Sequence, residues 1–176
     1  MSKPDILQMG LYPDWDQAPL DAAFHMHRYF AAADKAAFLA EVGPKVRGIA
    51  TRGELGANAA IIAACPQLEV ISVYGVGYDA VDLAACRARG IRVTSAAPAL
   101  GQDVAETAVG LILVGVKRIW PLAQHVRDGG WRETPWWPAR ELRGKIVGII
   151  GGGNIGRHVI RLLAPFEPHV LVYDPY

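Results

Sequence analysis

Short runs of apolar and β-branched residues alternate along the first half of the chain with segments that have apolar positions at helical spacing. The runs predict strands at residues 5–9, 25–28, 46–50, 68–74 and 91–94. The segments between them predict helices at residues 19–24, 34–42, 58–65 and 80–89. Strands that alternate with helices favour a parallel sheet covered on both faces. The first half is therefore expected to be an α/β domain.

Three positions in this half carry signals for helix ends. Asn58 can cap the helix that follows it, and either Asp79 or Asp82 can cap the next one. Gly90 stands where a helix needs a left-handed residue before the next strand begins.

The pattern changes after Thr94, and we expect a domain boundary between residues 98 and 99. Residues 95–101 predict a loop that crosses to the second domain, and residues 103–116 predict a long apolar helix, buried on most sides. Residues 128–139 place three tryptophans among glycines and prolines, and we expect an ordered arm there. This arm either docks on a partner or covers its own domain.

A glycine-rich turn, GGGNIG at residues 151–156, is the most informative motif of the chain. It lies between a predicted buried strand at 145–150 and a predicted helix at 155–163. A further strand, at 170–173, ends in an acid 18 positions beyond the last glycine of the motif. This context is typical of a dinucleotide-binding βαβ unit.

Each part of this motif has a physical role in such a site. Gly151 permits the tight turn, Gly153 lets the backbone approach a pyrophosphate, and Gly156 lets the helix pack close to the strand. The N–H groups around Asn154 and Ile155 face the phosphates at the positive end of the helix.

Asp174 is the acid of this motif. We expect it to accept hydrogen bonds from the adenosine ribose and to repel a 2′-phosphate, which favours NAD over NADP. Two alternatives remain: a glycine turn that binds no ligand, and an aspartate that only starts the turn at the following proline.

Composition narrows the possible partners. The net charge is +1, with 18 basic and 17 acidic residues scattered along the chain, which argues against nucleic acid and anionic membranes as partners. No signal peptide is recognised, and the longest apolar run, 108–116, is shorter than the roughly 20 residues of a membrane span. Cys65 and Cys86 fit buried, reduced thiols. We expect a cytoplasmic protein with a small-molecule partner and no metal site.

Taken together, these motifs resemble the D-isomer-specific 2-hydroxyacid dehydrogenases, and among them the branch of glyoxylate, hydroxypyruvate and hydroxyphenylpyruvate reductases. The resemblance covers essentially the whole chain and is carried by residues 68–94, 103–113, 130–131, 142–156 and 172–176. It implies a flavodoxin-like substrate domain at 1–98, followed by the first βαβ unit of a Rossmann NAD-binding domain at 99–176. It also implies a homodimer that acts on a 2-oxoacid or 2-hydroxyacid.

The resemblance implies that the loop Tyr74, Gly75, Val76 and Gly77 offers backbone N–H groups to the substrate carboxylate. A glycine-rich loop after a strand can present amides to an anion in this way. A plain strand-to-helix turn is the alternative. Arg52 either borders the same cleft or is a solvated side chain.

In this family a catalytic Arg, Glu and His follow the second strand of the NAD domain by dozens of residues. We therefore expect no catalytic residue among these 176 positions, and the histidines at 25, 27, 125, 158 and 169 match none of the family positions. Where relatives read Asn-Thr-Pro, this chain reads Ser95 to Pro98, with the proline displaced by one.

These features predict NAD(H)-dependent reduction of a 2-oxoacid by the intact family member. The 176-residue chain alone is expected to bind NAD weakly or not at all, to reduce no 2-oxoacid, and to associate. The alternative is a non-catalytic NAD-responsive binding protein or an inactive fragment.

Overall fold

The structure, a computed structural model, describes residues 3–133 and 138–176. The chain divides into two compact units, residues 1–97 and 98–176. This division lies one residue before the boundary expected from the sequence.

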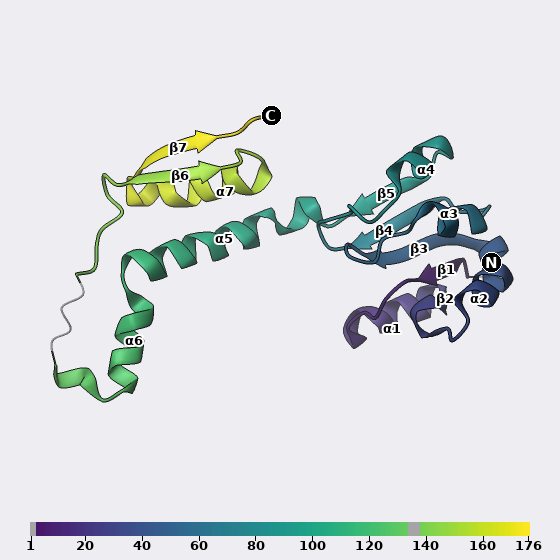
Figure 1. The fold of residues 1–176 in the computed structure, drawn as a ribbon, viewed down its shortest axis with the longest axis horizontal. Coiled ribbons are helices and arrows are strands. Elements are labelled where there is room, and N and C mark those ends of the chain that lie inside the picture. Colours follow the sequence, from purple (N-terminus) through teal and green to yellow (C-terminus); the bar gives the residue numbers. More distant parts are fainter. Residues whose placement is uncertain (1–2, 134–137) are drawn as a thin grey trace. The chain divides into compact units, whose positions relative to one another are not determined.

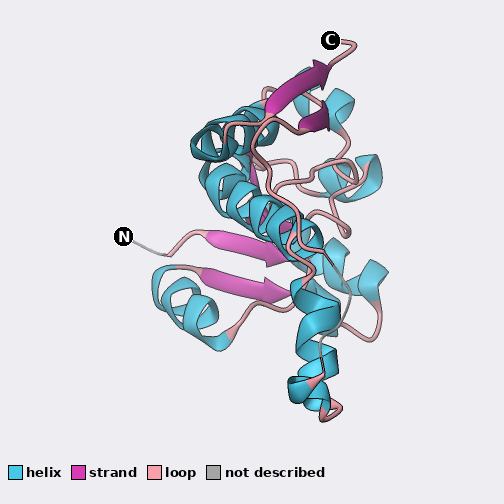
Figure 2. Ribbon diagram, turned by 90° about the vertical axis from the view of Figure 1, so that its left-hand side faces the viewer, coloured by secondary structure: helices cyan, strands magenta, loops and turns pink. Residues whose placement is uncertain are grey.

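The first unit is built around a parallel sheet of five strands in the order β2-β1-β3-β4-β5 (Figure 1). Helices and strands alternate along its sequence, and Figure 2 distinguishes the two kinds of element by colour. The strands are β1 (Asp5–Gln8), β2 (His25–Arg28), β3 (Val46–Arg52), β4 (Val70–Tyr74) and β5 (Arg92–Ser95). The helices are α1 (Asp14–Ala23), α2 (Lys35–Val42), α3 (Ala59–Ala64) and α4 (Leu83–Ala88), with 3-10 turns at Tyr29–Ala31 and Gly43–Lys45. The predicted α/β class is confirmed.

The local signals for helix ends act as predicted. The Asn58 side chain accepts a hydrogen bond from the N–H of Ile61 at 3.0 Å. Of the two candidate caps for α4, Asp82 is the one used, since its carboxylate accepts from the N–H of Ala85 at 2.9 Å. Gly90 has a φ of 68°, the left-handed conformation expected after α4.

The core of the first unit joins its central strands to its helices. Leu7 of β1, Ile49 of β3 and Ile71 of β4 are almost fully buried. Cys65 and Cys86 belong to the same core, and both are free thiols. Burial raises the pKa of the Cys65 thiol to about 11 and also raises that of Cys86. The prediction that both cysteines are buried is confirmed.

The second unit joins three helices to a pair of parallel strands. The helices are α5 (Ala97–Val116), α6 (Ile119–Arg127) and α7 (Asn154–Leu163). The strands are β6 (Ile146–Ile150) and β7 (His169–Tyr173), and 3-10 turns lie at Gly130–Arg132 and Ala164–Phe166. The β6-α7-β7 segment is the predicted βαβ unit.

Three elements differ from the sequence prediction. α1 begins at Asp14 rather than at residue 19, with Pro19 inside the helix, although proline favours the first turn. α5 begins at Ala97, so most of the segment 95–101 is helical and the prediction of a loop there is mostly wrong. The proline of this segment lies in the first turn of α5, where proline is tolerated because the N–H groups have no partner within the helix. α6 was not predicted, and Arg118, with a φ of 55°, separates it from α5.

The predicted burial of α5 and β6 is wrong for this chain. Only 17% of residues 99–116 are buried, and Leu111 is 67% exposed. On β6, Val147 and Ile149 pack against the helices, whereas Ile146 and Ile150 are 71% and 89% exposed. Helices therefore cover only one face of this strand pair.

Two further expectations concern α5 and the tryptophan arm. Residues 99–116, with a mean hydropathy of 1.4, are long and apolar enough to cross a membrane. Core helices of soluble proteins meet the same two criteria of length and composition. In the arm, Trp131 lies in a 3-10 turn and is 77% exposed, while Trp136 and Trp137 lie outside the described residues.

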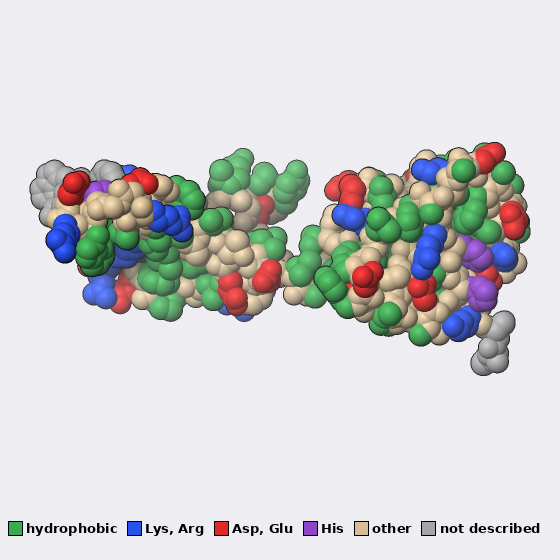
Figure 3. Space-filling view, turned by 90° about the horizontal axis from the view of Figure 1, so that it is seen from below, with side chains coloured by type: hydrophobic (Ala, Val, Ile, Leu, Met, Phe, Trp, Pro, Cys, Tyr) green, Lys and Arg blue, Asp and Glu red, His purple; other side chains and the backbone are tan. Residues whose placement is uncertain are grey.

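Acidic, basic and apolar side chains are interspersed on the surface that Figure 3 shows.

Candidate functional site

The glycine turn after β6 has the backbone geometry that its sequence predicts. Gly151 has a φ of 99°, and its N–H donates to the carbonyl of Tyr173 at the end of β7, at 2.8 Å. A Cβ on Gly156 would lie 2.1 Å from the carbonyl oxygen of Gly151. The position of Gly151 therefore requires a residue that tolerates a positive φ, and the position of Gly156 has no room for a side chain.

Gly153 differs from these two glycines because it faces open space. A Cβ built on it would meet nothing within 4 Å, and its φ of −69° is accessible to any residue. It stands at the N-terminus of α7 with no side-chain cap, so the first N–H groups of the helix remain available to a ligand. An anion can approach the backbone there, at the positive end of the helix.

Asn154 and Ile155 begin α7, beside this open space. The Asn154 amide packs against α5, since a Cβ on Gly101 would lie 2.5 Å from its Nδ2. The sequence did not predict this contact. Ile155 is 39% exposed.

Asp174 follows β7 and contacts the glycine turn directly. Its Oδ2 accepts a hydrogen bond from the N–H of Gly152 at 2.6 Å, and its Oδ1 accepts one from the N–H of Tyr176 at 3.1 Å. These two hydrogen bonds lower the pKa of the Asp174 carboxyl, and the nearby Arg157 adds to the effect. The carboxylate is therefore ionised at neutral pH and exposed to solvent.

Arg157 is a residue of this turn that the sequence analysis missed. Its Nε donates to the carbonyl oxygen of Gly152 at 2.9 Å. Gly152 is thus held through its N–H by Asp174 and through its carbonyl by Arg157. The motif spacing contains no signal for this contact, because only the folded turn brings the guanidinium back to Gly152.

In the first unit, the structure brings the two predicted substrate loops together. Arg52 ends β3, Tyr74 ends β4, and the two are register partners. After them, a Cβ on Gly53 would lie 2.6 Å from the carbonyl oxygen of Gly77. Gly75 has a φ of 128°, and its carbonyl accepts from the N–H of Ala96 at 2.8 Å.

The backbone N–H groups of Val76 and Gly77 lie in this loop. Among residues 3–133 and 138–176, neither donates a hydrogen bond to another group of the chain. Val76 is 41% exposed. The loop can therefore present two free amides to an anion, as an oxygen-binding nest requires.

The side chains beside this loop have partners within the unit. The Arg52 guanidinium forms an ion pair with Glu54 at 2.8 Å. The Tyr74 hydroxyl donates to Asp16 at 2.9 Å, and this hydrogen bond raises the pKa of Tyr74. The Tyr74 ring also lies 5.0 Å, centroid to centroid, from the ring of Tyr12.

Tyr12 and Asp16 were missed by the sequence analysis. The Tyr12 hydroxyl donates to the carbonyl of Thr51 at 3.1 Å, and burial raises its pKa to about 12. Both residues follow β1, the neighbour of β3 in the sheet. Because the carboxyl ends of parallel strands share one edge, the segment after β1 could have been included among the candidates.

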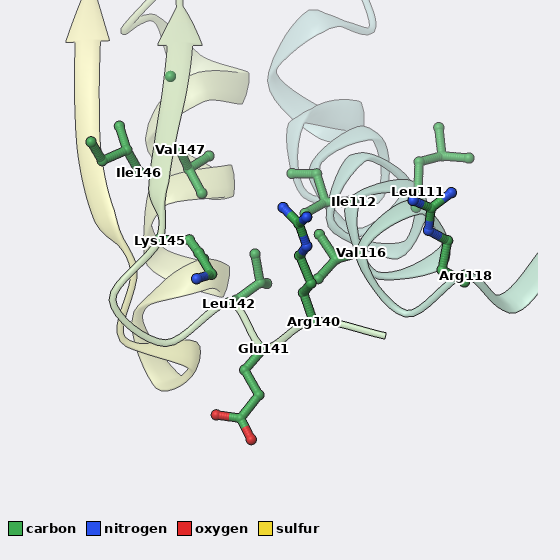
Figure 4. A pocket seen from close by; sticks show the side chains of 12 residues that line it. Leu111, Ile112, Val116, Arg118, Arg140, Glu141, Leu142, Lys145, Ile146 and Val147 are labelled. Atoms are coloured by element: carbon green, nitrogen blue, oxygen red, sulfur yellow. The ribbon is translucent and has the colours of Figure 1, made fainter. Parts of the chain in front are cut away.

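Two cavities accompany these elements. One, of about 460 Å³, lies at the carboxyl ends of β1 and β3 and is lined by Met9, Tyr29, Phe30, Lys35 and Arg52 among others. The second, of about 650 Å³, lies in the second unit between α5 and residues 140–148 (Figure 4). Its lining reaches Gly148 and does not include the glycine turn. Only the first cavity shares a residue with a predicted site.

Comparison with known proteins agrees with this arrangement. Residues 12–162 match the D-isomer specific 2-hydroxyacid dehydrogenases, catalytic domain. Glyoxylate/hydroxypyruvate reductase A of Arabidopsis thaliana is 31% identical over 174 residues, which are 99% of this chain and 56% of that protein.

Two solved structures extend the comparison. The 2-hydroxyacid dehydrogenase of Ketogulonicigenium vulgare Y25 superposes with a TM-score of 0.91 at 53% identity, over 98% of this chain and 54% of that one. An NADPH-dependent glyoxylate/hydroxypyruvate reductase of Sinorhizobium meliloti, solved with NADP and malonate, gives a TM-score of 0.77 at 35% identity, over 97% of this chain and 53% of that one. The chain thus spans about half the length of the proteins it matches. It belongs to the family of D-isomer specific 2-hydroxyacid dehydrogenases.

Proposed function

We propose that this chain supplies the substrate-binding domain and the pyrophosphate-binding turn of an NAD(H)-dependent oxidoreductase that reduces a small 2-oxoacid of the glyoxylate or hydroxypyruvate class. The observation that carries the proposal is the turn itself. Gly151 is left-handed, Gly156 leaves no room for a side chain, and Gly153 faces open space. A pyrophosphate would occupy that space, against the free N–H groups at the start of α7.

In this proposal the loop at residues 75–77 holds the carboxylate of the substrate. The free N–H groups of Val76 and Gly77 donate to it, and Arg52 adds positive charge from the neighbouring strand end when its ion pair with Glu54 opens. The bound nicotinamide supplies the hydride that reduces the 2-oxo group. We assign no described side chain of this chain as the acid that protonates the carbonyl oxygen.

We propose NAD rather than NADP as the cofactor. Asp174 carries an exposed, ionised carboxylate at the end of β7, where the adenosine ribose binds in such sites. It would accept hydrogen bonds from the ribose hydroxyls and repel a 2′-phosphate. The Sinorhizobium meliloti relative was solved with NADP, so the preference has to be tested on this chain.

We extend the proposal to the cellular location and the oligomeric state of the protein. Two buried free thiols and a mixed surface charge support a cytoplasmic protein that binds neither membrane nor nucleic acid. Exposed apolar side chains, Leu111 on α5 and Trp131 in the arm, support a homodimer contact. Sedimentation of the intact family member would show a dimer if this is right.

Amide chemical shifts of the isotope-labelled chain test the cofactor site most directly. Because the 176-residue chain is expected to bind NAD weakly, the titration has to reach high NAD concentrations; NAD should then shift the amides of residues 152–156, and NADP should shift them less at the same concentration. The variant Gly153→Ala should lose this response while it stays folded, because its new methyl group points into the proposed pyrophosphate space. Gly110→Ala is the matched control, since Gly110 also faces open space but lies on α5.

Two outcomes would contradict the proposal. One is an unchanged response in Gly153→Ala, and the other is a response to NAD that maps outside the turn. Assays of glyoxylate and hydroxypyruvate reduction complete the test. We expect no turnover by the 176-residue chain and would abandon that expectation on finding robust activity.

A further inference from the structure

Three potential metal ligands meet at the N-terminal ends of two neighbouring strands. Asp5 begins β1, His25 begins β2, and the two are register partners in the parallel pair. His27 lies two residues after His25 and therefore on the same face of β2. One ligand atom from each of the three side chains lies within 4.8 Å of the other two.

The spacing inside this cluster is close to that of a coordination shell. The Nε2 of His27 lies 2.7 Å from the Oδ1 of Asp5. Two ligands of one tetrahedral zinc ion, with bonds of about 2.0–2.2 Å, stand about 3.4 Å apart. The ring of His25 lies 6.2 Å from that of His27, centroid to centroid, in a stacked arrangement. A metal ion can therefore fit between Asp5 and His27 after a side-chain movement of less than about 1 Å.

The neighbouring cations point elsewhere. The Lys3 ammonium donates to the backbone carbonyl of Asp21, and the Arg28 guanidinium pairs with the Asp21 carboxylate at 3.0 Å. An ordinary ion pair would account for Asp5 and His27 alone. It does not require His25, which adds a second imidazole to the same face and is exposed to solvent.

We propose that Asp5, His25 and His27 bind a divalent transition-metal ion, with Zn²⁺ as the first candidate. Two imidazoles and one carboxylate suit zinc, cobalt, nickel or copper, whereas calcium and magnesium prefer oxygen ligands alone. The exposed side of His25 leaves room for water to complete the shell. Neutral imidazoles are the binding form, and His27 would bind the ion through Nε2 in the tautomer that carries its proton on Nδ1.

The site lies apart from the proposed substrate loop. Asp5 and His25 stand at the amino ends of their strands, whereas Arg52 and Tyr74 stand at the carboxyl ends of theirs. In the described sheet β2 is an edge strand and pairs with β1. A bound ion would join these two strands through side chains, so its effect is on the stability of the first unit rather than on catalysis.

Calorimetric titration of the whole chain with ZnCl₂ tests the proposal. We expect one equivalent to bind, and His25→Gln and Asp5→Asn to weaken the affinity by roughly tenfold or more. His169→Gln is the matched control, because His169 is also an exposed histidine that begins a strand, β7. Cobalt absorption spectra should show the same loss in His25→Gln.

Thermal unfolding gives a second readout. At one zinc concentration, the melting temperature should rise less in His25→Gln than in the parent chain and in His169→Gln. Far-ultraviolet circular dichroism without metal verifies that His25→Gln is folded. The proposal is wrong if the parent chain binds no zinc, or if His25→Gln binds it as tightly as His169→Gln does. Neither result would affect the proposed cofactor site.

Discussion

The carboxylate of Asp174 holds the backbone N–H of Gly152 at 2.6 Å, across 22 positions of sequence. The acid expected to read the ribose of a dinucleotide therefore also fixes the turn that faces the pyrophosphate. Arg157 holds the carbonyl of the same glycine, so the turn is shaped by two ionised side chains.

Substitution of Asp174 should separate its two roles. Asp174→Ala removes both acceptors, so the amide proton of Gly152 should exchange faster with solvent. Asp174→Asn keeps one acceptor oxygen and should protect Gly152 better, but it loses the negative charge. In Asp174→Asn we therefore expect the preference for NAD over NADP to fall while the turn persists. Equal exchange rates at Gly152 in the two variants would contradict the structural role.

Gly156→Ala should destabilise the second unit. The new Cβ would lie 2.1 Å from the carbonyl oxygen of Gly151, and backbone must move to relieve this contact. We expect a loss of about 1–3 kcal/mol in the free energy of unfolding, measured by urea titration. Gly110→Ala, where a Cβ meets nothing within 4 Å, should be neutral or stabilising by up to about 1 kcal/mol. A loss of equal size in both variants would argue against the close packing.

The choice of cap at α4 gives a paired prediction. Asp82→Ala removes the hydrogen bond to the N–H of Ala85 and should cost about 1 kcal/mol of stability. Asp79→Ala removes no helix cap and should change stability by less than about 0.5 kcal/mol. Urea unfolding of the two variants, followed by circular dichroism, compares them directly. The reverse order would mean that Asp79 is the cap in solution.

Tyr12 should make stability fall at high pH. Its pKa rises from 10.0 to about 12 in the folded chain, mainly through burial, while nearby Arg52 opposes the rise. Because the folded state keeps the phenol protonated, this contribution is fully present below pH 10 and is lost as pH rises from about 10 to 12. Absorbance at 295 nm should show a late-titrating tyrosine that is missing from Tyr12→Phe. A titration unchanged by this substitution would contradict the assignment.

Local patterns in the sequence carried much of the fold. The cap at Asn58, the left-handed Gly90 and the glycine turn depend on residues a few positions apart, so their types and spacing suffice to predict them. For α4 the sequence left Asp79 and Asp82 as alternatives, and only the folded helix start selects Asp82. The partners of Tyr74 could not be found in this way. Tyr12 and Asp16 reach it only because β1, β3 and β4 end at one edge of the sheet.

Burial was harder to predict than secondary structure. The apolar composition of α5 and β6 indicates that these segments suit an apolar environment, but composition does not identify what covers them. Ala105 and Val109 of α5 pack on α7, whereas Leu111 is exposed. The same holds for Trp131: the sequence predicts a contact arm there but does not identify what the exposed side chain contacts.

Both cysteines of the chain lie buried in the first unit, with pKa values raised above that of a free thiol. Thiolate is the form that reacts with alkylating reagents, so at neutral pH these side chains are shielded by ionisation as well as by packing. Labelling of Cys65 or Cys86 therefore has to wait until this part of the chain opens. The labelling rate of the two thiols therefore measures how often the core of the first unit opens to solvent.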